Sequence, residues 1–218
     1  MHPLRLDLPS GRPPRLLCLG AHADDLEIGC GGTVLHLIRA HPGIHCRWVV
    51  WSGDETRVAE ARDAATKVLA GAGRADVSVE GFRDGYFPDQ WAQIKQKFDA
   101  LRAETRPDLI LTHHRHDRHQ DHRVVAELTW NTWRDDLILE YEIPKFEGDL
   151  STPSLYVPLD RATVDRKIDI LMTGFASQRD KPWYDAETFR GLMRIRGVEC
   201  AASGGYAEGF HAPKLSLT

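Results

Sequence analysis

The chain has 218 residues, of which 42% are hydrophobic and 28% charged, a balance that can bury the core of one α/β domain. Its formal net charge of −4 excludes the basic character expected of a nucleic-acid-binding protein. No run reaches the roughly 18 apolar residues of a membrane span, and the first residues lack the apolar stretch of a secretory signal. We therefore expect a cytoplasmic protein without stable membrane insertion.

Short apolar runs alternate with segments of helical composition through the first two thirds of the chain. Strands are predicted at 15–20, 46–51, 77–82, 108–112 and 137–142. Helices are predicted at 29–40, 57–70, 89–105 and 122–133. This order predicts an α/β fold with a Rossmann-like, mostly parallel sheet and helices on both faces.

The two ends of the chain differ from this pattern. Residues 1–14 contain several prolines and predict an extended arm, so residues 15–218 are expected to form a single domain. The last third predicts a C-terminal elaboration, with a strand at 154–159, helices at 161–174 and 185–195, and a closing segment at 204–217.

The first motif, AHADDLEIGCGGT at residues 21–33, begins where the first predicted strand ends. His22 and Asp25 offer an imidazole and a carboxylate, a mixture of ligands that Zn²⁺ accepts. Asp24 would lie beside the metal and could take a proton from bound water. Adjacent acids are also common as a charge pair at a helix N-terminus, but the histidine, the strand end and the glycines favour a site.

The second motif, HHRHDRHQDHR at residues 113–123, follows the fourth predicted strand. Such a concentration of imidazole indicates metal or proton chemistry. We predict that His122 is a third metal ligand beside His119, and that Asp121 orients one of these imidazoles from behind. The roles of the other three histidines stay open: His113, His114 and His116.

The two motifs together describe one kind of centre. His22, Asp25 and His122 with an open position are typical of a catalytic rather than a structural zinc site. A metal ion there would lower the pKa of bound water towards about 7. That water could attack a carbonyl, with Asp24 taking its proton. His119 would stabilise the oxyanion or protonate the leaving amine. The ligands do not fix the metal, because Fe²⁺ or another divalent ion accepts the same set.

At these residues the sequence resembles the LmbE/PIG-L family of zinc-dependent de-N-acetylases. The matches are HADD at 22–25, GCGGT at 29–33 and HQDHR at 119–123. Weaker similarity extends over most of the chain, at 57–60, 84–85, 177–178 and 206–208. The resemblance implies an enzyme that removes an N-acetyl group from an amino sugar or a sugar conjugate, with a small-molecule amino sugar as its partner.

The resemblance also implies roles for individual residues. His22, Asp25 and His122 match the zinc ligands, Asp24 the base and His119 the oxyanion-stabilising or acid histidine. Two further residues, Arg57 and Asp84, fall where family members contact the sugar. Two departures stand out: Ala23 replaces a proline, and Asp117 lies near the place of a tyrosine that assists the oxyanion in some members. We expect Asp117 to pair with a nearby histidine or with Arg115.

Several alternatives stay open on the sequence. The runner-up is an amidase that cleaves a larger sugar conjugate with the same chemistry. A non-heme Fe(II) oxygenase could use the same triad, and a sugar-binding module could keep the fold without catalysis. A dinucleotide-binding protein is disfavoured, because residues 29–32 do not complete G-x-G-x-x-G and acids precede them. The sequence leaves the oligomeric state open, a homo-oligomer included.

Overall fold

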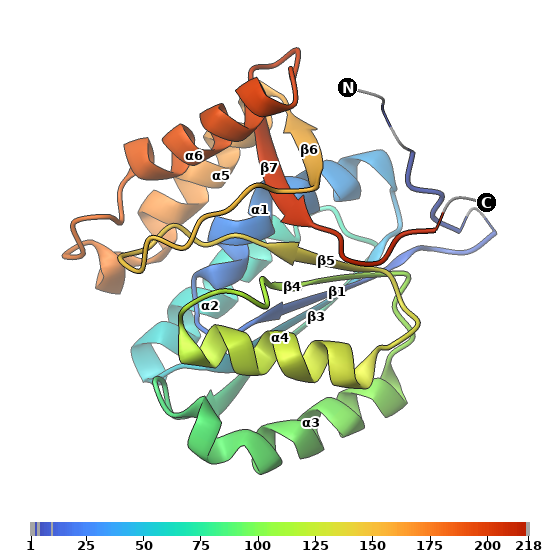
Figure 1. The fold of residues 1–218 in the computed structure, drawn as a ribbon, viewed down its shortest axis with the longest axis vertical. Helices are drawn as coiled ribbons and strands as arrows, with labels where there is room; N and C mark the ends of the chain where they lie inside the picture. The colour runs from blue at the N-terminus through green and yellow to red at the C-terminus, as the bar shows by residue number, and fades with distance from the viewer. Residues whose placement is uncertain (1–2, 4, 10, 217–218) are drawn as a thin grey trace.

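The computed structural model describes residues 3, 5–9 and 11–216, which form an α/β domain around a seven-stranded sheet (Figure 1). The strands are β1 (Arg15–Gly20), β2 (His45–Ser52), β3 (Arg74–Phe82), β4 (Leu109–His113), β5 (Ile138–Tyr141), β6 (Leu155–Leu159) and β7 (Tyr206–His211). Their order across the sheet is β3-β2-β1-β4-β5-β7-β6. The first five strands are parallel, and β7 is antiparallel to both of its neighbours.

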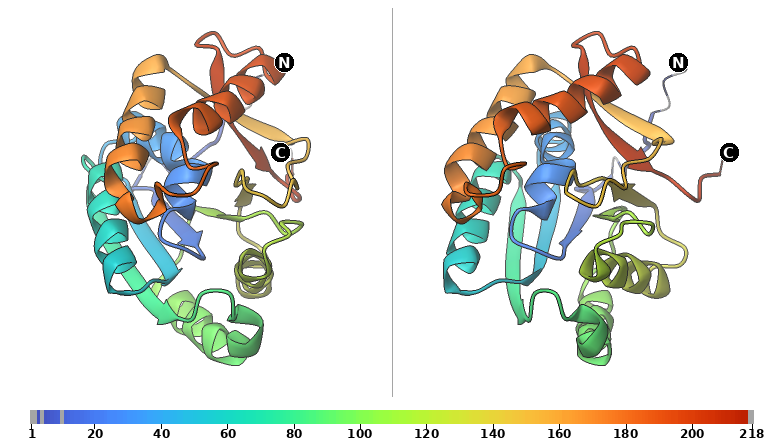
Figure 2. Two further views of the ribbon diagram at one scale, coloured as in Figure 1. Left: turned by 90° about the vertical axis from the view of Figure 1, so that its left-hand side faces the viewer. Right: turned by 60° about the vertical axis from the view of Figure 1, so that its left-hand side comes forward.

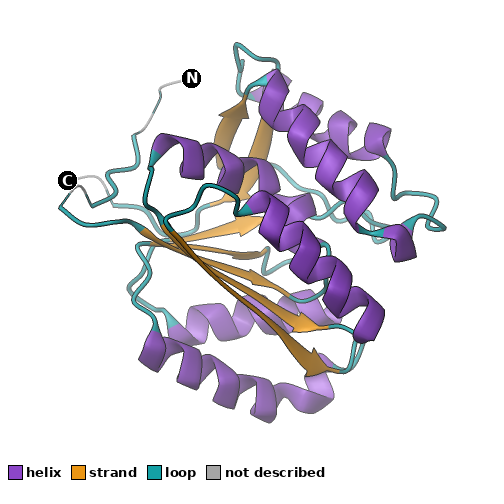
Figure 3. Ribbon diagram, turned by 180° about the vertical axis from the view of Figure 1, so that it is seen from behind, coloured by secondary structure: helices purple, strands orange, loops and turns teal. Residues whose placement is uncertain are grey.

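Helices cover both faces of the sheet, as Figures 2 and 3 show. One layer contains α1 (Asp25–Ala40), α2 (Glu55–Val68), α5 (Arg161–Gly174) and α6 (Ala186–Glu199), and the other contains α3 (Trp91–Glu104) and α4 (Gln120–Thr132). Two short 3₁₀ turns, η1 (Phe87–Gln90) and η2 (Ala176–Gln178), complete the list. Among the described residues, no helix is long and apolar enough to cross a bilayer. The predicted fold class is confirmed.

The order of the strands positions the two motifs. β1 lies in the interior of the sheet, buried from Leu16 onwards, and it pairs with β2 on one side and with β4 on the other. Strands that are buried on both faces have continuous runs of apolar residues, and such runs made these strands predictable from the sequence. From β1 the chain adds β2 and β3 on one side of the sheet, and it then adds β4 and β5 on the other side. Open α/β sheets bind ligands where the strand order reverses in this way, beyond the carboxyl ends of the strands.

The start of α1 differs from the prediction. The helix begins at Asp25 and not at residue 29, so the second aspartate of the motif lies in the first helical turn. The positive end of the helix dipole favours an acid there. The glycines that suggested a helix start lie inside the helix, where they allow close packing: a Cβ on Gly29 would lie 2.2 Å from the ring of Tyr141.

The described part of the N-terminal segment contains no helix or strand. Leu8 packs against the main core, and Arg12 donates a hydrogen bond to Asp108 over 2.8 Å. Four residues of the predicted arm lie outside the described part of the chain, namely residues 1, 2, 4 and 10. At the other end, the closing segment contributes β7, which extends the parallel sheet by antiparallel pairing.

Candidate metal centre

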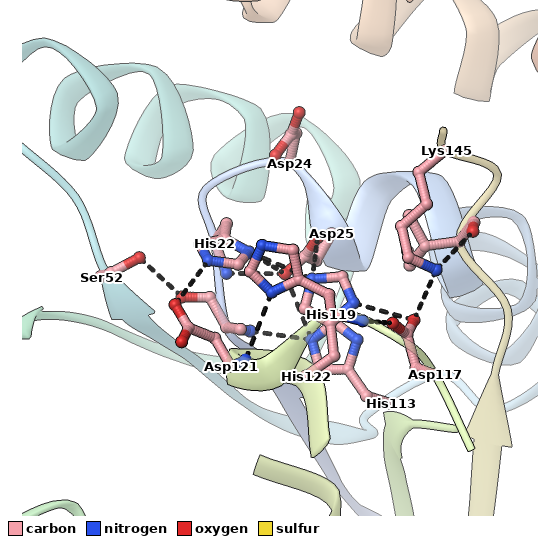
Figure 4. Close-up of polar contacts among 12 residues, drawn as sticks. His22, Asp24, Asp25, Ser52, His113, Asp117, His119, Asp121, His122 and Lys145 are labelled. Carbon is pink, nitrogen blue, oxygen red and sulfur yellow. Dashed lines mark hydrogen bonds and ion pairs between the residues drawn. The ribbon is translucent and has the colours of Figure 1, made fainter. Parts of the chain in front are cut away.

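Side chains from two loops converge at the carboxyl ends of β1 and β4. His22 follows β1, and Asp25 begins α1. His119 caps the N-terminus of α4, and His122 lies in the first turn of that helix. Figure 4 shows these four side chains together, with Asp24 somewhat apart. The structure therefore brings together residues that are about 100 positions apart in the sequence.

The side chains of His22, Asp25 and His122 form a compact triangle. His22 Nδ1 lies 3.1 Å from His122 Nε2 and 3.3 Å from Asp25 Oδ2. His122 Nε2 lies 3.5 Å from Asp25 Oδ1. A tetrahedral ion with bonds of about 2.0 to 2.2 Å holds its ligands roughly 3.3 to 3.6 Å apart. The three contacts are close to this spacing, and each imidazole faces a different oxygen of Asp25.

The hydrogen bonds behind the two imidazoles determine where their protons lie. His22 Nε2 lies 3.2 Å from an oxygen of Asp121 and 3.0 Å from one of Asp84, so Asp121 lies behind the imidazole of the first motif and not, as predicted, behind one of its own motif. His122 Nδ1 lies 2.9 Å from an oxygen of Asp117. Since a carboxylate only accepts, each of these nitrogens carries the proton of a neutral imidazole. In two neutral rings the nitrogens that face each other at 3.1 Å are both unprotonated, and either a proton or a metal ion between them relieves the repulsion.

The electrostatics of the two histidines differ. Burial alone would lower the pKa of His22, but Asp25, Asp121 and Asp84 together raise it well above its ordinary value. Burial lowers the pKa of His122 to about 3. In the absence of a metal, a proton on His22 would therefore occupy the triangle. A divalent ion competes with that proton for the same three atoms.

Asp25 is the most heavily surrounded carboxylate of the centre. It accepts a hydrogen bond from the backbone N–H of His22 over 2.6 Å, and it lies 3.2 Å from Nε2 of His113. Burial opposes its ionisation, but His122, His113 and His22 lower its pKa well below the ordinary value. Asp25 is thus held as an anion. His113, which the sequence left without a role, is wholly buried and stacks on His122 with 3.9 Å between ring centroids.

Three overlapping groups of side chains each bring potential ligand atoms within 4.8 Å of one another. They are His22 with His119 and His122, Asp25 with His113 and His122, and His22 with Asp84 and Asp121. His119 is distinguished by its Nδ1, which accepts from the backbone N–H of Asp121 over 3.3 Å. In the neutral ring Nε2 therefore carries the proton, which makes His119 a potential hydrogen-bond donor beside the centre.

Asp24 lies in a different environment from its neighbour. It is buried, and Arg57 Nη2 contacts its Oδ1 at 3.0 Å. Burial raises the pKa of Asp24 against the opposing charge of Arg57, and Asp25 raises it further. Arg57 also reaches Asp84, with 3.4 Å between Nη1 and Oδ2. The two residues expected at the sugar therefore adjoin the centre, and Asp84 keeps 54% of its side chain exposed.

Asp117 pairs with His122 and not with Arg115. Arg115 instead binds the buried Glu140 at 2.8 Å. The second partner of Asp117 is Lys145, which the sequence analysis missed. A single lysine in the loop after β5 gives no pattern that the sequence could reveal, because its place depends on how that loop packs against the segment between β4 and α4.

A profile of the PIG-L family, described as GlcNAc-PI de-N-acetylase, matches residues 17–133, more than half of the chain and both motifs. The chain belongs to the PIG-L family. No curated protein matches its sequence.

Solved structures share the PIG-L fold of this chain at low sequence identity. A protein from Thermus thermophilus has 23% identity and a TM-score of 0.72, covering 93% of this chain and 96% of its own. The N,N'-diacetylchitobiose deacetylase from Pyrococcus horikoshii has 18% identity and a TM-score of 0.67, covering 90% and 82%. The 4-carboxy-2-hydroxymuconate hydratase from Pseudomonas putida has 18% identity and a TM-score of 0.72, covering 94% and 98%. These likenesses concern the fold.

Proposed function

We propose that this PIG-L family member is a metal-dependent hydrolase that removes an N-acetyl group from an amino sugar or a sugar conjugate. The observation that carries the proposal is the pair of imidazole nitrogens, His22 Nδ1 and His122 Nε2, which face each other at 3.1 Å beside the anionic Asp25. A carboxylate behind each ring keeps these nitrogens free to bind an ion.

His22, Asp25 and His122 would hold the ion and leave a position open. We propose zinc, and Fe²⁺ or another divalent ion is compatible with the same two nitrogens and one oxygen. When bound, such an ion supplies Lewis acidity, which lowers the pKa of water and polarises a carbonyl. The neighbouring side chains of this chain supply the proton transfers.

Asp24 is the proposed general base, and His119 is the proposed donor. Asp24 takes a proton from the attacking water, whose oxygen bonds to the acetyl carbon. The raised pKa of Asp24 brings this carboxylate closer to the working pH of a general base. His119 Nε2–H donates to the developing oxyanion. The C–N bond then breaks as the proton held by Asp24 passes to the leaving amine, directly or through His119, so that acetate and the free amino sugar are the products and Asp24 is a carboxylate again.

Arg57 and Asp84 are proposed to contact the sugar. Arg57 bridges Asp24 and Asp84, so it also keeps the base in place. The half-exposed carboxylate of Asp84 can accept hydrogen bonds from sugar hydroxyls. Because both residues adjoin the centre, the amino group and its neighbouring hydroxyls are the part of the substrate that they would recognise.

Acetate release from a panel of N-acetylated amino sugars, chitobiose and sugar nucleotides tests the proposal. Metal-stripped protein should be inactive and should recover with Zn²⁺ or Fe²⁺. Asp24→Asn should keep the metal but lose about 10²- to 10⁴-fold in kcat, the usual contribution of a general base. Asp54→Asn, which removes an aspartate that caps α2, is the matched control and should retain activity.

The hydratase of similar fold makes a second assay necessary. The same preparations are incubated with an unsaturated hydroxy acid, and addition of water is followed by loss of absorbance. The alternative of an amidase is tested with larger N-acylated sugar conjugates. For these compounds the free amine is detected and not acetate. Hydration of the acid without release of amine from any conjugate would overturn the proposal.

A further inference from the structure

We propose that Lys145 is a positioning residue of the metal centre, which fixes the ring of His122 by holding Asp117 from the loop between β5 and β6. The inference rests on the proposed function, since it concerns the same centre. Lys145 lies 23 positions beyond His122 in the sequence and belongs to neither motif.

Lys145 is almost wholly buried in a chain of three charged groups. Its ammonium lies 2.9 Å from Asp117 Oδ2, and 2.8 and 2.7 Å from the two oxygens of Asp149. The exposed fractions of the three side chains are 7% for Lys145, 3% for Asp117 and 7% for Asp149. Figure 4 shows the ammonium between Asp117 and a second carboxylate, on the far side of Asp117 from His22. Burial to this degree is rare for lysine unless its charge is paired.

Asp117 uses its two oxygens for two parts of the centre. Oδ1 accepts from the backbone N–H of His119 over 2.7 Å, and Oδ2 accepts from Nδ1 of His122 over 2.9 Å. One carboxylate therefore fixes both the start of α4 and the imidazole that points Nε2 into the triangle. Lys145 shares Oδ2 with His122, so the ammonium sets the orientation of the oxygen that holds the ring.

Removing the ammonium would leave Asp117 buried as an anion without its charged partner. Breaking a buried ion pair from one side carries a large penalty, which the structure relieves by moving the remaining charge. Asp117 would then turn away from His122. The ring would lose the hydrogen bond that fixes its proton on Nδ1. Outer partners of metal-binding histidines typically contribute 10- to 100-fold in metal affinity.

The same loop offers a matched control at its other end. Arg196 of α6 binds Glu142 at 2.9 and 2.7 Å and the carbonyl oxygen of Ser151 at 2.8 Å. It is a buried cation that anchors residues 142–154, as Lys145 does, but its ion pairs are with Glu142 and Glu199 and not with Asp117. A variant at Arg196 therefore loosens the loop without removing the hydrogen-bond partner of Asp117.

Zinc affinity measured by competition with a chromophoric chelator tests the proposal. The proteins are the wild type, Lys145→Met, Lys145→Arg and Arg196→Met, each checked for folding by circular dichroism. Lys145→Met should bind zinc about 10- to 100-fold more weakly than the wild type. Lys145→Arg should recover most of the affinity because it restores the charge. Arg196→Met should match the wild type in affinity even if its melting temperature falls.

The outcomes separate the two proposals. A wild type that binds no divalent ion refutes the proposed metal centre. A wild type that binds zinc, with Lys145→Met equally tight or with Arg196→Met weakened to the same extent, overturns the role of Lys145.

A measurement on the wild type alone covers the case in which Lys145→Met does not fold. Because binding and positioning are reciprocal, bound zinc should slow the chemical labelling of the Lys145 amine several-fold. Mass spectrometry measures the rate of labelling. Labelling of the exposed Lys97 is the internal control. An unchanged rate at Lys145 with zinc bound would overturn the proposal.

Discussion

Carboxylates placed behind imidazoles determine what the candidate centre can bind. Asp121 and Asp117 take the outward N–H groups of His22 and His122, and the inward nitrogens are left as lone pairs. His119 is held the other way round, because its Nδ1 accepts from the backbone and its Nε2 keeps the proton. Three histidines close together are thus held in two different ways by their hydrogen-bond partners.

The two neighbouring aspartates of the first motif also differ in pKa because of their surroundings. Contacts with three histidines hold Asp25 as an anion, whereas burial raises the pKa of Asp24. Two adjacent carboxylates whose pKa values move in opposite directions are a frequent arrangement where one binds and the other transfers a proton. This contrast supports the division of roles in the proposed mechanism.

One histidine outside the centre should influence stability in acid. His211 stacks on His114 at 3.8 Å, and burial and the charge of His114 lower its pKa to about 4. Between about pH 6.5 and 4, the unfolded chain binds a proton at this residue and the folded chain does not. Stability must therefore fall as the pH falls through that window. Urea unfolding at pH 7 and pH 4.5 should show a smaller loss for His211→Gln than for the wild type. An equal loss in the two proteins would show that His211 does not titrate differently on folding.

At the scale of elements, α1 is pressed against the sheet through its glycines. A Cβ at Gly29 would meet the ring of Tyr141 at 2.2 Å, and one at Gly32 would meet Leu159 at 2.6 Å. Gly32 and Thr33 also donate their backbone N–H groups to Glu208 of β7, at 2.8 and 2.6 Å. The buried Lys167 of α5 completes this contact with Glu208. The close approach places the N-terminus of α1, with Asp25, beside His122.

Two alanine substitutions in α1 should have opposite effects. Gly29→Ala forces Tyr141 or the helix to move, and overpacking of this kind costs about 1 to 3 kcal/mol. Gly31→Ala meets nothing nearer than 3.8 Å and should stabilise the protein by up to about 1 kcal/mol, because alanine favours a helix over glycine. The free energy of unfolding in urea measures both. Equal effects of the two substitutions would contradict the close packing at Gly29.

The elements that the sequence predicted best are those with an unambiguous apolar period. The helix at 161–174 has the predicted bounds, and β1 matches residues 15–20. The start of α1 was predicted four residues late, because glycine is normally a poor helix residue and here the packing against Tyr141 outweighs its propensity. The fate of the closing segment, which pairs as β7 between β5 and β6, depends on contacts far apart in the sequence.

The residues of the candidate centre also differ in how far the sequence could predict them. Those in the two motifs were accessible to sequence reasoning, since residue type, spacing and position after a strand all pointed to metal chemistry. Lys145 and Asp149 were not, because their relation to Asp117 exists only after the loop at 142–154 has folded over the centre. In the sequence His113 is one of several neighbouring histidines, and its contact with Asp25 forms only when both side chains are buried in the fold.

At the scale of the whole molecule, the order of the strands creates the centre. Because β1 and β4 are adjacent, the segments that follow them open towards the same point (Figure 1). Glu208 of β7 accepts hydrogen bonds from the backbone of α1, so the C-terminal third supports the centre from outside. The fold is shared with a deacetylase and with a hydratase, so the chemistry must be decided at the centre itself.

Anomalous diffraction at the zinc edge from zinc-soaked crystals tests the central claim most directly. We predict one strong peak bonded to His22 Nδ1, Asp25 and His122 Nε2, with His119 and Asp24 outside bonding distance. The three side-chain groups that also bring ligand atoms together make other positions available. A peak bonded to His119, or one between Asp84 and Asp121, would contradict the assignment of ligands, of donor and of base.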